Sequence, residues 1–458
     1  MTAAASPAGA NRAGTVHVIG AGLAGLAAAV ALADSGREII LYEAGRQAGG
    51  RCRSFLDPGL GVRIDNGNHL LLSGNAAALS YIERIGAVAT FEPAAPAIPF
   101  LDLASGERWT LRPGPGRIPW WLLSARRTVP GARLRDWLDL LRLWRAGPND
   151  TVAAALRTNR PLFRRLWEPL TVAALNTPAA AASAPLLWRV VAETLGRGAA
   201  GCRPLLAREG LSESLVDPAL AFLARHGCAI RFGAVLRALE FAGTRVGALG
   251  FDDHAVALRP HDAVILAVPA AIAARLVPGL VVPDDYAPIV NAHFRYAAPS
   301  SLPLFAGVVG GAAEWVFRKR EVVSVTVSAA DQLVDRPAEA LRDLLWRDVA
   351  RAFGVKPKPA PPARIVKERR ATFRATPAQL RRRPPTGTSW NNLRLAGDYV
   401  DTGLPATIEG AIRSGFAAAA AIRAPVADMA IRSPAGLPHP APGTHRGLPA
   451  RAAMKSGP

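Results

Sequence analysis

The sequence predicts an α/β fold in which a domain built on a parallel sheet carries an inserted domain of mixed α+β character. Residues 15–51 follow the order strand, glycine-rich turn, helix, second strand and acidic residue. Residues 395–415 give the end of a strand, a loop and a helix near the other end of the chain. The 458 residues, 50% of them apolar, are enough to bury two cores.

The first of these elements is an apolar strand followed by a glycine pattern. The apolar run 16–19 is typical of a buried parallel strand, and the G-x-G-x-x-G after it consists of Gly20, Gly22 and Gly25. Gly20 permits a tight turn, and Gly22 lets the backbone approach a pyrophosphate that a Cβ atom would block. Gly25 lets the next helix pack close to the strand. Together they indicate a Rossmann-like dinucleotide-binding domain.

The helix after the turn and the strand after the helix complete this pattern. Leu23 and Ala24 begin the helix, where free N–H groups and the positive end of the helix dipole favour a phosphate. The following strand, 39–42, ends at Glu43, which is 43 − 25 = 18 residues beyond the last glycine. That is close to the ~20 residues expected for an acid that binds a ribose 2′-hydroxyl. An acid there repels a 2′-phosphate, so NADP is disfavoured.

A second glycine element distinguishes between NAD and FAD. Arg46, Gly49, Gly50, Arg51 and Ser54 give R-x-x-G-G-R-x-x-S. A second bare backbone segment and an arginine can meet the pyrophosphate from its other side. The alternative is a simple Gly-Gly turn with a solvated arginine. The element resembles the motif that follows the ribose-binding acid in FAD enzymes of the amine oxidase and phytoene desaturase superfamily.

A third element lies near the C-terminus. Gly397 and Asp398 follow an apolar strand, and Thr407 and Ile408 open the next helix. In the superfamily that the second element resembles, such a G-D pair contacts the ribityl and pyrophosphate portion of FAD. The helix points its N-terminus at the pyrimidine end of the flavin, where it stabilises negative charge. The alternative is an ordinary edge that closes the sheet.

Three further strings narrow the resemblance. They are I-D-N-G-N-H-L-L-L-S-G-N at 64–75, W-E-P-L-T-V-A-A-L-N-T-P at 167–178, and the segment 203–220. With the FAD motifs, they resemble the squalene-associated FAD-dependent desaturases of bacterial hopanoid synthesis, over about residues 15–424. That family acts as hydroxysqualene dehydroxylase. The resemblance implies reductive removal of the hydroxyl of hydroxysqualene to give squalene, with FAD as cofactor and a long apolar isoprenoid as substrate.

Such a reaction needs an acid that protonates the leaving hydroxyl of an allylic alcohol. Asp65 and His69 are the candidates, because the resemblance places their loop beside the flavin. A histidine titrates near working pH and is suited to this role. The structural alternative is that Asp65 caps a turn and His69 is a hydrogen-bonded structural histidine. No motif identifies the electron donor that reduces the flavin.

The FAD-binding domain is expected to be discontinuous, with pieces at 15–90, 206–284 and 389–424. The segments 91–205, mostly helical, and 285–388, with strands at 314–317 and 322–328 and a helix at 337–352, should form the substrate domain.

The two ends of the chain, 1–14 and 425–458, are expected to be a disordered leader and a disordered tail. No apolar run is long enough for a transmembrane helix. Three cysteines have no metal or disulfide spacing, which fits a reducing cytoplasm.

The formal charge of +20 suggests an anionic partner, and no nucleic-acid-binding module is visible. Residues 112–145 carry eight arginines and four tryptophans against two aspartates. Apolar residues from Leu134 to Trp144 recur at helical spacing, so the region is either an interfacial helix that contacts a membrane surface or a helix packed in the core. Membrane contact predicts a protein peripheral on the inner membrane.

Several other functions remain open from the residues alone. A carotenoid or phytoene desaturase would remove hydride from a similar isoprenoid on the same scaffold. An amine oxidase would cage its amine with aromatic residues, which the 6% aromatic content does not support. A non-catalytic flavin-binding scaffold at the membrane would also suit the basic, tryptophan-rich region. An NAD-dependent dehydrogenase is disfavoured by the Gly49-Gly50 and Gly397-Asp398 elements.

Overall fold

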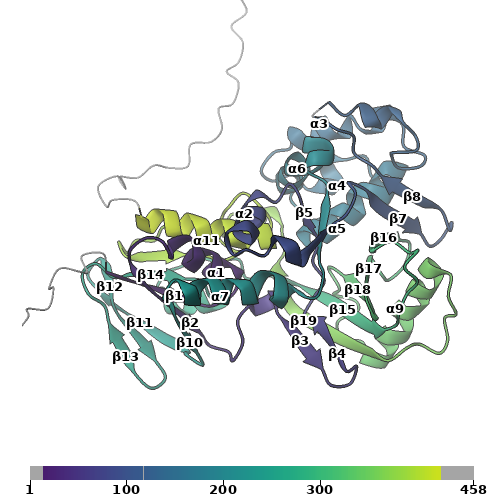
Figure 1. Cartoon of the computed structure of the whole chain (residues 1–458). Coiled ribbons are helices and arrows are strands. Elements are labelled where there is room, and N and C mark those ends of the chain that lie inside the picture. The colour runs from purple at the N-terminus through teal and green to yellow at the C-terminus, as the bar shows by residue number, and fades with distance from the viewer. Residues whose placement is uncertain (1–13, 117, 424–458) are drawn as a thin grey trace, which may run out of the picture. The chain divides into compact units, whose positions relative to one another are not determined.

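The computed structural model describes residues 14–116 and 118–423. Its central element is a parallel five-stranded sheet of order β10-β2-β1-β14-β20 (Figure 1). The strands are β1 (Thr15–Ile19), β2 (Glu38–Glu43), β10 (Ala229–Phe232), β14 (Ala263–Leu266) and β20 (Leu393–Leu395). Three segments far apart in sequence therefore build one sheet. The predicted leader, except Gly14, and the predicted tail lie outside the described residues.

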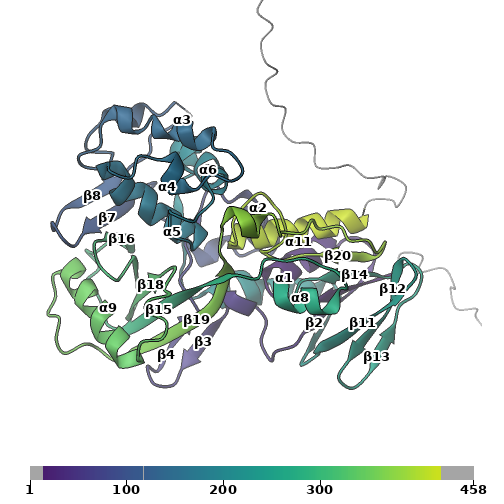
Figure 2. The same cartoon turned by 180° about the vertical axis from the view of Figure 1, so that it is seen from behind.

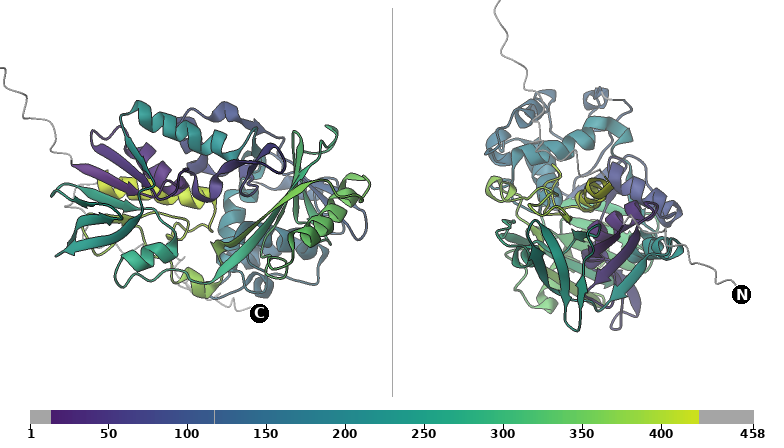
Figure 3. Two further views of the ribbon diagram at one scale, coloured as in Figure 1. Left: turned by 90° about the horizontal axis from the view of Figure 1, so that it is seen from below. Right: turned by 90° about the vertical axis from the view of Figure 1, so that its left-hand side faces the viewer.

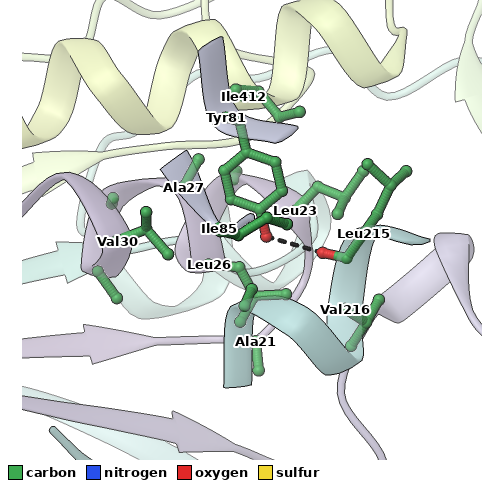
Figure 4. Packing of buried hydrophobic residues seen from close by; sticks show 14 of the residues in the cluster. Ala21, Leu23, Leu26, Ala27, Val30, Tyr81, Ile85, Leu215, Val216 and Ile412 are labelled. Carbon is green, nitrogen blue, oxygen red and sulfur yellow. Dashed lines mark hydrogen bonds between the residues drawn. The ribbon is translucent and has the colours of Figure 1, made fainter. Parts of the chain in front are cut away.

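Each face of this sheet packs on a different core, because alternate strand residues point in opposite directions. Val16, Val18 and Leu41 belong to a core shared with helices on one face. Those helices are α1 (Leu23–Leu32), α2 (Ala76–Arg84), α7 (Asp217–Arg225) and α11 (Ile408–Arg423). In Figure 4, Tyr81 of α2 lies between these helices, and its hydroxyl donates a hydrogen bond to the Leu215 carbonyl at 2.8 Å.

The opposite face carries Ile40, Tyr42 and Val264 into a second core. It is covered by α8 (Ala270–Leu276) and by an antiparallel sheet of β11 (Leu236–Ala242), β12 (Arg245–Phe251) and β13 (Ala255–Ala257). Figure 2 shows α8 and this small sheet beside the parallel strands. The fold is α/β with helices on the sheet, as the sequence predicted.

A seven-stranded mixed sheet of order β19-β15-β18-β17-β16-β7-β8 forms the second large element. Its strands are β7 (Ile98–Asp102), β8 (Arg108–Leu111), β15 (Tyr286–Arg295), β16 (Phe305–Val309), β17 (Trp315–Lys319), β18 (Val322–Val327) and β19 (Ala363–Phe373). The long neighbours β15 and β19 are visible in Figure 3. One face packs on α9 (Ala338–Phe353) through a core of valines, leucines and Trp346. The strands and the helix expected in 285–388 are therefore confirmed.

The segment 91–205 differs from the mostly helical prediction, because it also supplies strands. β7 and β8 extend the seven-stranded sheet, with β7 parallel to β16. β6 (Phe91–Pro93), β9 (Pro204–Ala207) and β5 (Leu71–Leu72) form a small separate sheet, as do β3 (Ser54–Asp57) and β4 (Val62–Asp65). β3 and β4 are neighbouring strands that pair with each other, as are β7 and β8. The pairings of β5, β6 and β7 with β9 or β16 join segments far apart in sequence, so no local pattern predicts them.

The helical part of this segment forms a lobe with its own tryptophan-rich core. Its α-helices are α3 (Asp139–Trp144), α4 (Val152–Ala155), α5 (Glu168–Leu175) and α6 (Ala184–Glu193), and α10 (Pro377–Leu380) lies between β19 and β20 in the chain. Short 3-10 helices cover Gly50–Cys52, Val88–Thr90, Trp120–Leu123, Leu134–Asp136 and Leu195–Ala200.

Two π-helical turns, Phe163–Trp167 and Ser212–Val216, lead directly into α5 and α7. Each stands just before a proline, Pro169 or Pro218, in the first turn of the following α-helix. A proline has no N–H to donate, which favours the wider hydrogen-bonding pattern there. Residues 212–225 are thus one helical segment, a π turn followed by α7.

The helical stripe expected across Leu134 to Trp144 is corrected by the structure. A 3-10 turn and the short α3 replace one continuous helix. Trp137 is buried and stacks edge-on with Trp121 and Trp167, whereas Leu138 and Trp144 are exposed. The predicted stripe therefore divides between the core of the lobe and its surface. In the described part of the chain, no helix has the length and apolar content needed to cross a membrane.

The sheet core gives one prediction about pH. His17 of β1 is buried, its Nδ1 lies 3.1 Å from the Tyr42 hydroxyl, and desolvation lowers its pKa from 6.5 to about 4. Between these values the unfolded chain binds more protons, so stability falls as pH drops from 6.5 toward 4, by on the order of 1–3 kcal/mol from this group. His17→Asn keeps a polar atom near Tyr42 and should flatten this dependence in urea unfolding at several pH values. An unchanged slope would contradict the assignment.

Candidate functional site

The first glycine turn separates two kinds of glycine. Gly20 has φ +103°, and a Cβ atom there would lie 2.6 Å from the Ala267 carbonyl oxygen. A Cβ atom on Gly25 would lie 1.9 Å from the Gly20 carbonyl oxygen, so α1 packs against the turn. Gly22, in contrast, has an ordinary extended conformation and no atom within 4 Å of its Cβ position. The protein's own packing requires the outer two glycines, while the middle one presents bare backbone to open space.

The second glycine turn lies against the first. Gly49 pairs with Gly22 as a parallel bridge, and its N–H donates to the Ala21 carbonyl at 2.8 Å. A Cβ atom on Gly50 would lie 3.5 Å from the Gly22 Cα. Gly49 and Gly50 have φ values of +103° and +56°, which favour glycine. Two bare backbone segments therefore meet at the N-terminus of α1, beside Leu23 and Ala24.

Glu43 stands at the end of β2, beside this pair of turns. Its Oε2 accepts a hydrogen bond from the Ala21 N–H at 2.9 Å, and its Oε1 accepts one from the Gly45 N–H at 2.8 Å. Each carboxylate oxygen has a second lone pair for a hydroxyl donor. Glu43 is only half-buried, so a ribose could reach it.

The arginine of the second motif meets the aspartate of the third. Arg51 forms an ion pair with Asp398 at 2.8 Å and donates to the Ala371 carbonyl at 2.5 Å. The Asp398 carboxylate raises the pKa of Arg51 above its ordinary value. The neighbouring Gly397 has φ +149° and donates its N–H to the Ser414 hydroxyl of α11 at 2.8 Å. The second and third motifs, which are far apart in sequence, thus meet at one place.

The loop between Asp398 and α11 is held by a residue that the sequence did not single out. Arg383 is buried and donates to the carbonyls of Leu404 at 2.7 Å and Val400 at 2.5 Å, with longer contacts to those of Tyr399 and Asp398 at 3.3 Å. Burial lowers its pKa, and its guanidinium lies over the Phe373 ring at 5.3 Å. In sequence it is the last of three adjacent arginines, a pattern typical of a solvated basic run.

The first residues of α11 have different roles. The Thr407 hydroxyl accepts a hydrogen bond from the Gly410 N–H at 3.1 Å and caps the helix. Ile408 packs its side chain in the core, so only its backbone N–H can face a ligand. Glu409 is buried, and its two oxygens accept hydrogen bonds from the first N–H groups of α2, at 3.1 Å from Ala77 and 2.8 Å from Ala78.

Asp65, a candidate acid, connects several elements. Its Oδ1 accepts hydrogen bonds from the Ser54 hydroxyl at 2.6 Å and the Leu211 N–H at 2.8 Å. Its Oδ2 pairs with the Lys319 ammonium of β17 at 3.0 Å. Lys319 was not singled out from sequence, because its partner lies 254 positions away. These contacts give the Asp65 carboxylate a linking role and leave it little capacity to act as a proton donor.

His69, the other candidate, is accessible to solvent although the protein around it desolvates the ring. Its pKa is lowered from 6.5 to about 4, mainly by desolvation, while the negative charge of Asp65 acts to raise it and the positive charge of Arg51 acts to lower it. The imidazole therefore lies within the electrostatic reach of both the Arg51–Asp398 pair and the Asp65–Lys319 pair. It is neutral near pH 7 and free to donate or accept one hydrogen bond.

The seven-stranded sheet presents polar groups toward this loop. The Asn68 side-chain amide donates to the Thr326 hydroxyl at 3.0 Å, and that hydroxyl donates to the side-chain amide oxygen (Oδ1) of Asn291 at 2.8 Å. His293 and Ser324, which pair across β15 and β18, are 2.8 Å apart. Asn68 thereby fixes the loop 66–69 to the seven-stranded sheet.

The sequence of this chain is similar to those of flavin-dependent enzymes. Residues 23–423 match the sequence model of the family "Flavin containing amine oxidoreductase". The hydroxysqualene dehydroxylase of Rhodopseudomonas palustris is 50% identical over 407 residues, which are 88% of this chain and 97% of that protein. Those of Sinorhizobium fredii and Zymomonas mobilis are 46% and 45% identical, each over 88% of this chain and 97% of theirs. The chain belongs to the hydroxysqualene dehydroxylase family. It is a flavin-dependent oxidoreductase.

Solved structures share the fold at low identity. A putative protoporphyrinogen oxidase of an Exiguobacterium species has a TM-score of 0.64 and 19% identity, with 90% of this chain and 98% of that chain covered. Cyclohexylamine oxidase of Brevibacterium oxydans also has a TM-score of 0.64, with 17% identity over the same shares. These likenesses show the fold alone.

The strings that suggested this family join elements of the site. Leu71–Leu72 pairs with Leu205 and Pro204, so the first string forms a sheet with the third. In the second string, Asn176 adopts φ +47° at the end of α5 and donates its amide to the Ala287 carbonyl at 3.1 Å. Asn176 therefore joins the helical lobe to β15, and the pairing of Leu71–Leu72 joins the 64–75 loop to β9.

Proposed function

We propose that this protein reduces hydroxysqualene to squalene and water, with FAD as its cofactor. The observation that carries the proposal is the 45–50% identity to three hydroxysqualene dehydroxylases over nearly their whole length. The reaction consumes one allylic alcohol, two electrons and two protons, and it yields one hydrocarbon and one water. The substrate is a long apolar isoprenoid with one hydroxyl, which the site must orient.

The residues around the glycine turns suit an FAD molecule. Gly22 has open space where a Cβ atom would lie, and a Cβ atom on Gly50 would meet only the Gly22 Cα, at 3.5 Å, so both leave room for a pyrophosphate. Gly49 is required by the protein's own packing, because its Cβ atom would lie 2.9 Å from the Val216 Cγ2. Glu43 has free lone pairs for a ribose. Arg51 and Asp398 would hold the pyrophosphate and ribityl portions. The following residues complete the proposed cofactor set: Gly20, Leu23, Ala24, Gly25, Gly397, Thr407 and Ile408.

The chemistry divides between cofactor and protein. Reduced FAD supplies hydride to the carbon that loses its hydroxyl. The protein must protonate the leaving hydroxyl, exclude water and hold the carbon in place. We assign His69 to the proton, because it is the accessible, titratable side chain of this loop, whereas Asp65 is engaged by Lys319, Ser54 and Leu211.

Two substitutions separate catalysis from structure. His69→Ala should lower turnover by about 100-fold or more while flavin content stays normal, as expected for loss of a general acid. Asp65→Asn should lower thermal stability and flavin content, with turnover per bound flavin nearly unchanged. Flavin absorbance and anaerobic single-turnover assays measure both. Full turnover by His69→Ala with normal flavin loading would remove His69 from the mechanism.

The pH dependence provides an independent check on His69. Its imidazolium form is the acid, and the fraction of that form rises as pH falls toward the lowered pKa of about 4. Wild-type single-turnover rates should therefore rise from about pH 8 to about pH 5, whereas His69→Gln should show a flat profile. Matching profiles in the two proteins would contradict the assignment.

Product analysis decides between reduction and desaturation. Photoreduced protein incubated anaerobically with hydroxysqualene should yield squalene, and oxidised protein should leave phytoene unchanged. The reverse result would favour the carotenoid desaturase alternative, although the zeta-carotene desaturase of Synechocystis, 42% identical over 72 residues, matches just 16% of this chain. Reduced flavin that hydroxysqualene fails to reoxidise would favour a non-catalytic scaffold.

The proposed substrate also bears on location. A long hydrocarbon with one hydroxyl partitions into bilayers, so the enzyme would collect it at a membrane surface. We therefore infer a protein that is peripheral on the cytoplasmic side of the inner membrane.

A further inference from the structure

Large apolar side chains are exposed together on the helical lobe. Their exposed fractions run from 47% for Leu141 to 68% for Trp120. The group, here called the lobe patch, consists of Ile118, Trp120, Leu123, Leu134, Leu138, Leu141 and Trp144. Elsewhere in the described residues, exposed large apolar side chains are scattered singly, which is normal for a protein surface.

A buried contact joins the two halves of the lobe patch. Trp121, next to Trp120, packs edge-on against Trp137, next to Leu138, with ring centroids 5.5 Å apart. The Arg112 N–H also donates to the Arg127 carbonyl at 2.9 Å and closes the loop that carries Ile118, Trp120 and Leu123. The inward tryptophans thus anchor two segments that each expose large apolar side chains. Figures 1 and 2 show α3 at the outer edge of the lobe, away from the five-stranded sheet.

The exposed charges on the described residues between 112 and 145 are of one sign. The exposed arginines there are Arg112, Arg126, Arg127, Arg133, Arg135, Arg142 and Arg145. Asp136 and Asp139 are the acids between 112 and 145, and both are buried. The guanidinium of Arg145 lies 5.4 Å from the Trp144 ring, so cation and indole are presented together. Tryptophan and leucine within a ring of arginines have the composition of an interfacial membrane contact.

We propose that the lobe patch docks this protein on an anionic bilayer surface, with Trp120, Leu123 and Trp144 entering the headgroup region. The arginines would contact lipid phosphates and carboxylates. The charge pattern favours this occupant, because a neutral protein surface or a second copy of this basic patch would leave seven arginines unpaired or repelling. This inference rests on the proposed function in one respect: an apolar substrate gives the protein a reason to dock on a membrane.

Vesicle flotation of the full-length flavoprotein tests the proposal. Wild type should float with phosphatidylglycerol-containing vesicles and much less with pure phosphatidylcholine. Trp120→Ser/Leu123→Ser should weaken binding about tenfold or more through lost apolar burial. Arg126→Gln/Arg127→Gln should weaken it about 25-fold, from roughly fivefold per arginine near the surface. Binding should also fall with added salt.

Matched variants elsewhere provide controls. Leu56→Ser/Val88→Ser removes two side chains that are each 62% exposed, and Arg225→Gln/Arg275→Gln removes two exposed arginines outside the lobe. Both controls should float like wild type. Equal flotation of lobe and control variants would overturn the proposal. So would a wild-type dimer that Trp120→Ser/Leu123→Ser dissociates in sedimentation experiments and that fails to bind vesicles.

Turnover measurements separate this inference from the proposed function. With substrate dispersed in detergent, the lobe-patch variants should retain wild-type single-turnover rates, and with substrate in anionic vesicles they should be slower. If wild type binds vesicles but does not dehydroxylate the substrate, the docking proposal is supported and the proposed reaction is wrong. If wild type dehydroxylates the substrate in detergent but does not bind vesicles, the proposed reaction is supported and the docking proposal is wrong.

Discussion

Gly22→Val is expected to give a folded protein that no longer retains its flavin. Its Cβ position meets no protein atom within 4 Å, and its backbone conformation suits any residue, so the fold has room for the side chain. The proposed pyrophosphate would occupy that room. We expect about 10–100-fold weaker flavin binding, from the ~1–3 kcal/mol cost of forcing methyl groups into filled space. Flavin absorbance after gel filtration, with circular dichroism for the fold, measures both.

Two neighbouring comparisons make this test specific. Gly25→Ala should damage the fold itself, because its Cβ atom would lie 1.9 Å from the Gly20 carbonyl oxygen, and the protein should be insoluble or far less stable. Gly387→Val adds the same side chain as Gly22→Val at another open site and should retain flavin and stability. Normal flavin content in Gly22→Val would show that the cofactor does not approach this turn.

The order of strands and helices around the glycine turns could be predicted because their causes are local. Gly20, Gly49 and Gly50 have positive φ, and such positions select glycine from the sequence directly. The apolar run of β1 and the acid at the end of β2 also follow from single segments. A pattern within a few residues suffices where the physical constraint acts within a few residues.

The features that could not be predicted depend on contacts between residues distant in sequence. The place of β7 in the seven-stranded sheet could not be predicted, because its parallel neighbour β16 lies about two hundred positions away. The alternation of Trp120 outward and Trp121 inward depends on Trp137, in another segment. Lys319 becomes part of the site only through Asp65. The family strings at 64–75 and 167–178 include residues that make such long-range contacts, since Asn176 and the 64–75 loop join separate elements.

Arg383 is the largest contribution that the sequence concealed, and its removal should disturb both stability and cofactor. Its guanidinium holds the carbonyls of Val400 and Leu404 within the loop that follows Asp398. Arg383→Met keeps a side chain of similar length but leaves those carbonyls without a donor. We expect a loss of about 3–5 kcal/mol in unfolding free energy, as when one partner of a buried charged network is removed. Urea unfolding measures it.

The conservative variant distinguishes charge from shape. Arg383→Lys retains the charge, but one ammonium cannot reach carbonyls on several sides as a planar guanidinium does, so it should recover only part of the stability. Because the loop carries Asp398 and leads to α11, flavin affinity should fall in the same order, with methionine below lysine and lysine below arginine. Arg382→Met, at a neighbouring arginine that contacts Val282 and Asp284, is the matched control and should leave flavin affinity unchanged. A stable Arg383→Met protein with full flavin would mean that the loop keeps its shape without the guanidinium, through Gly397 and Ser414 alone.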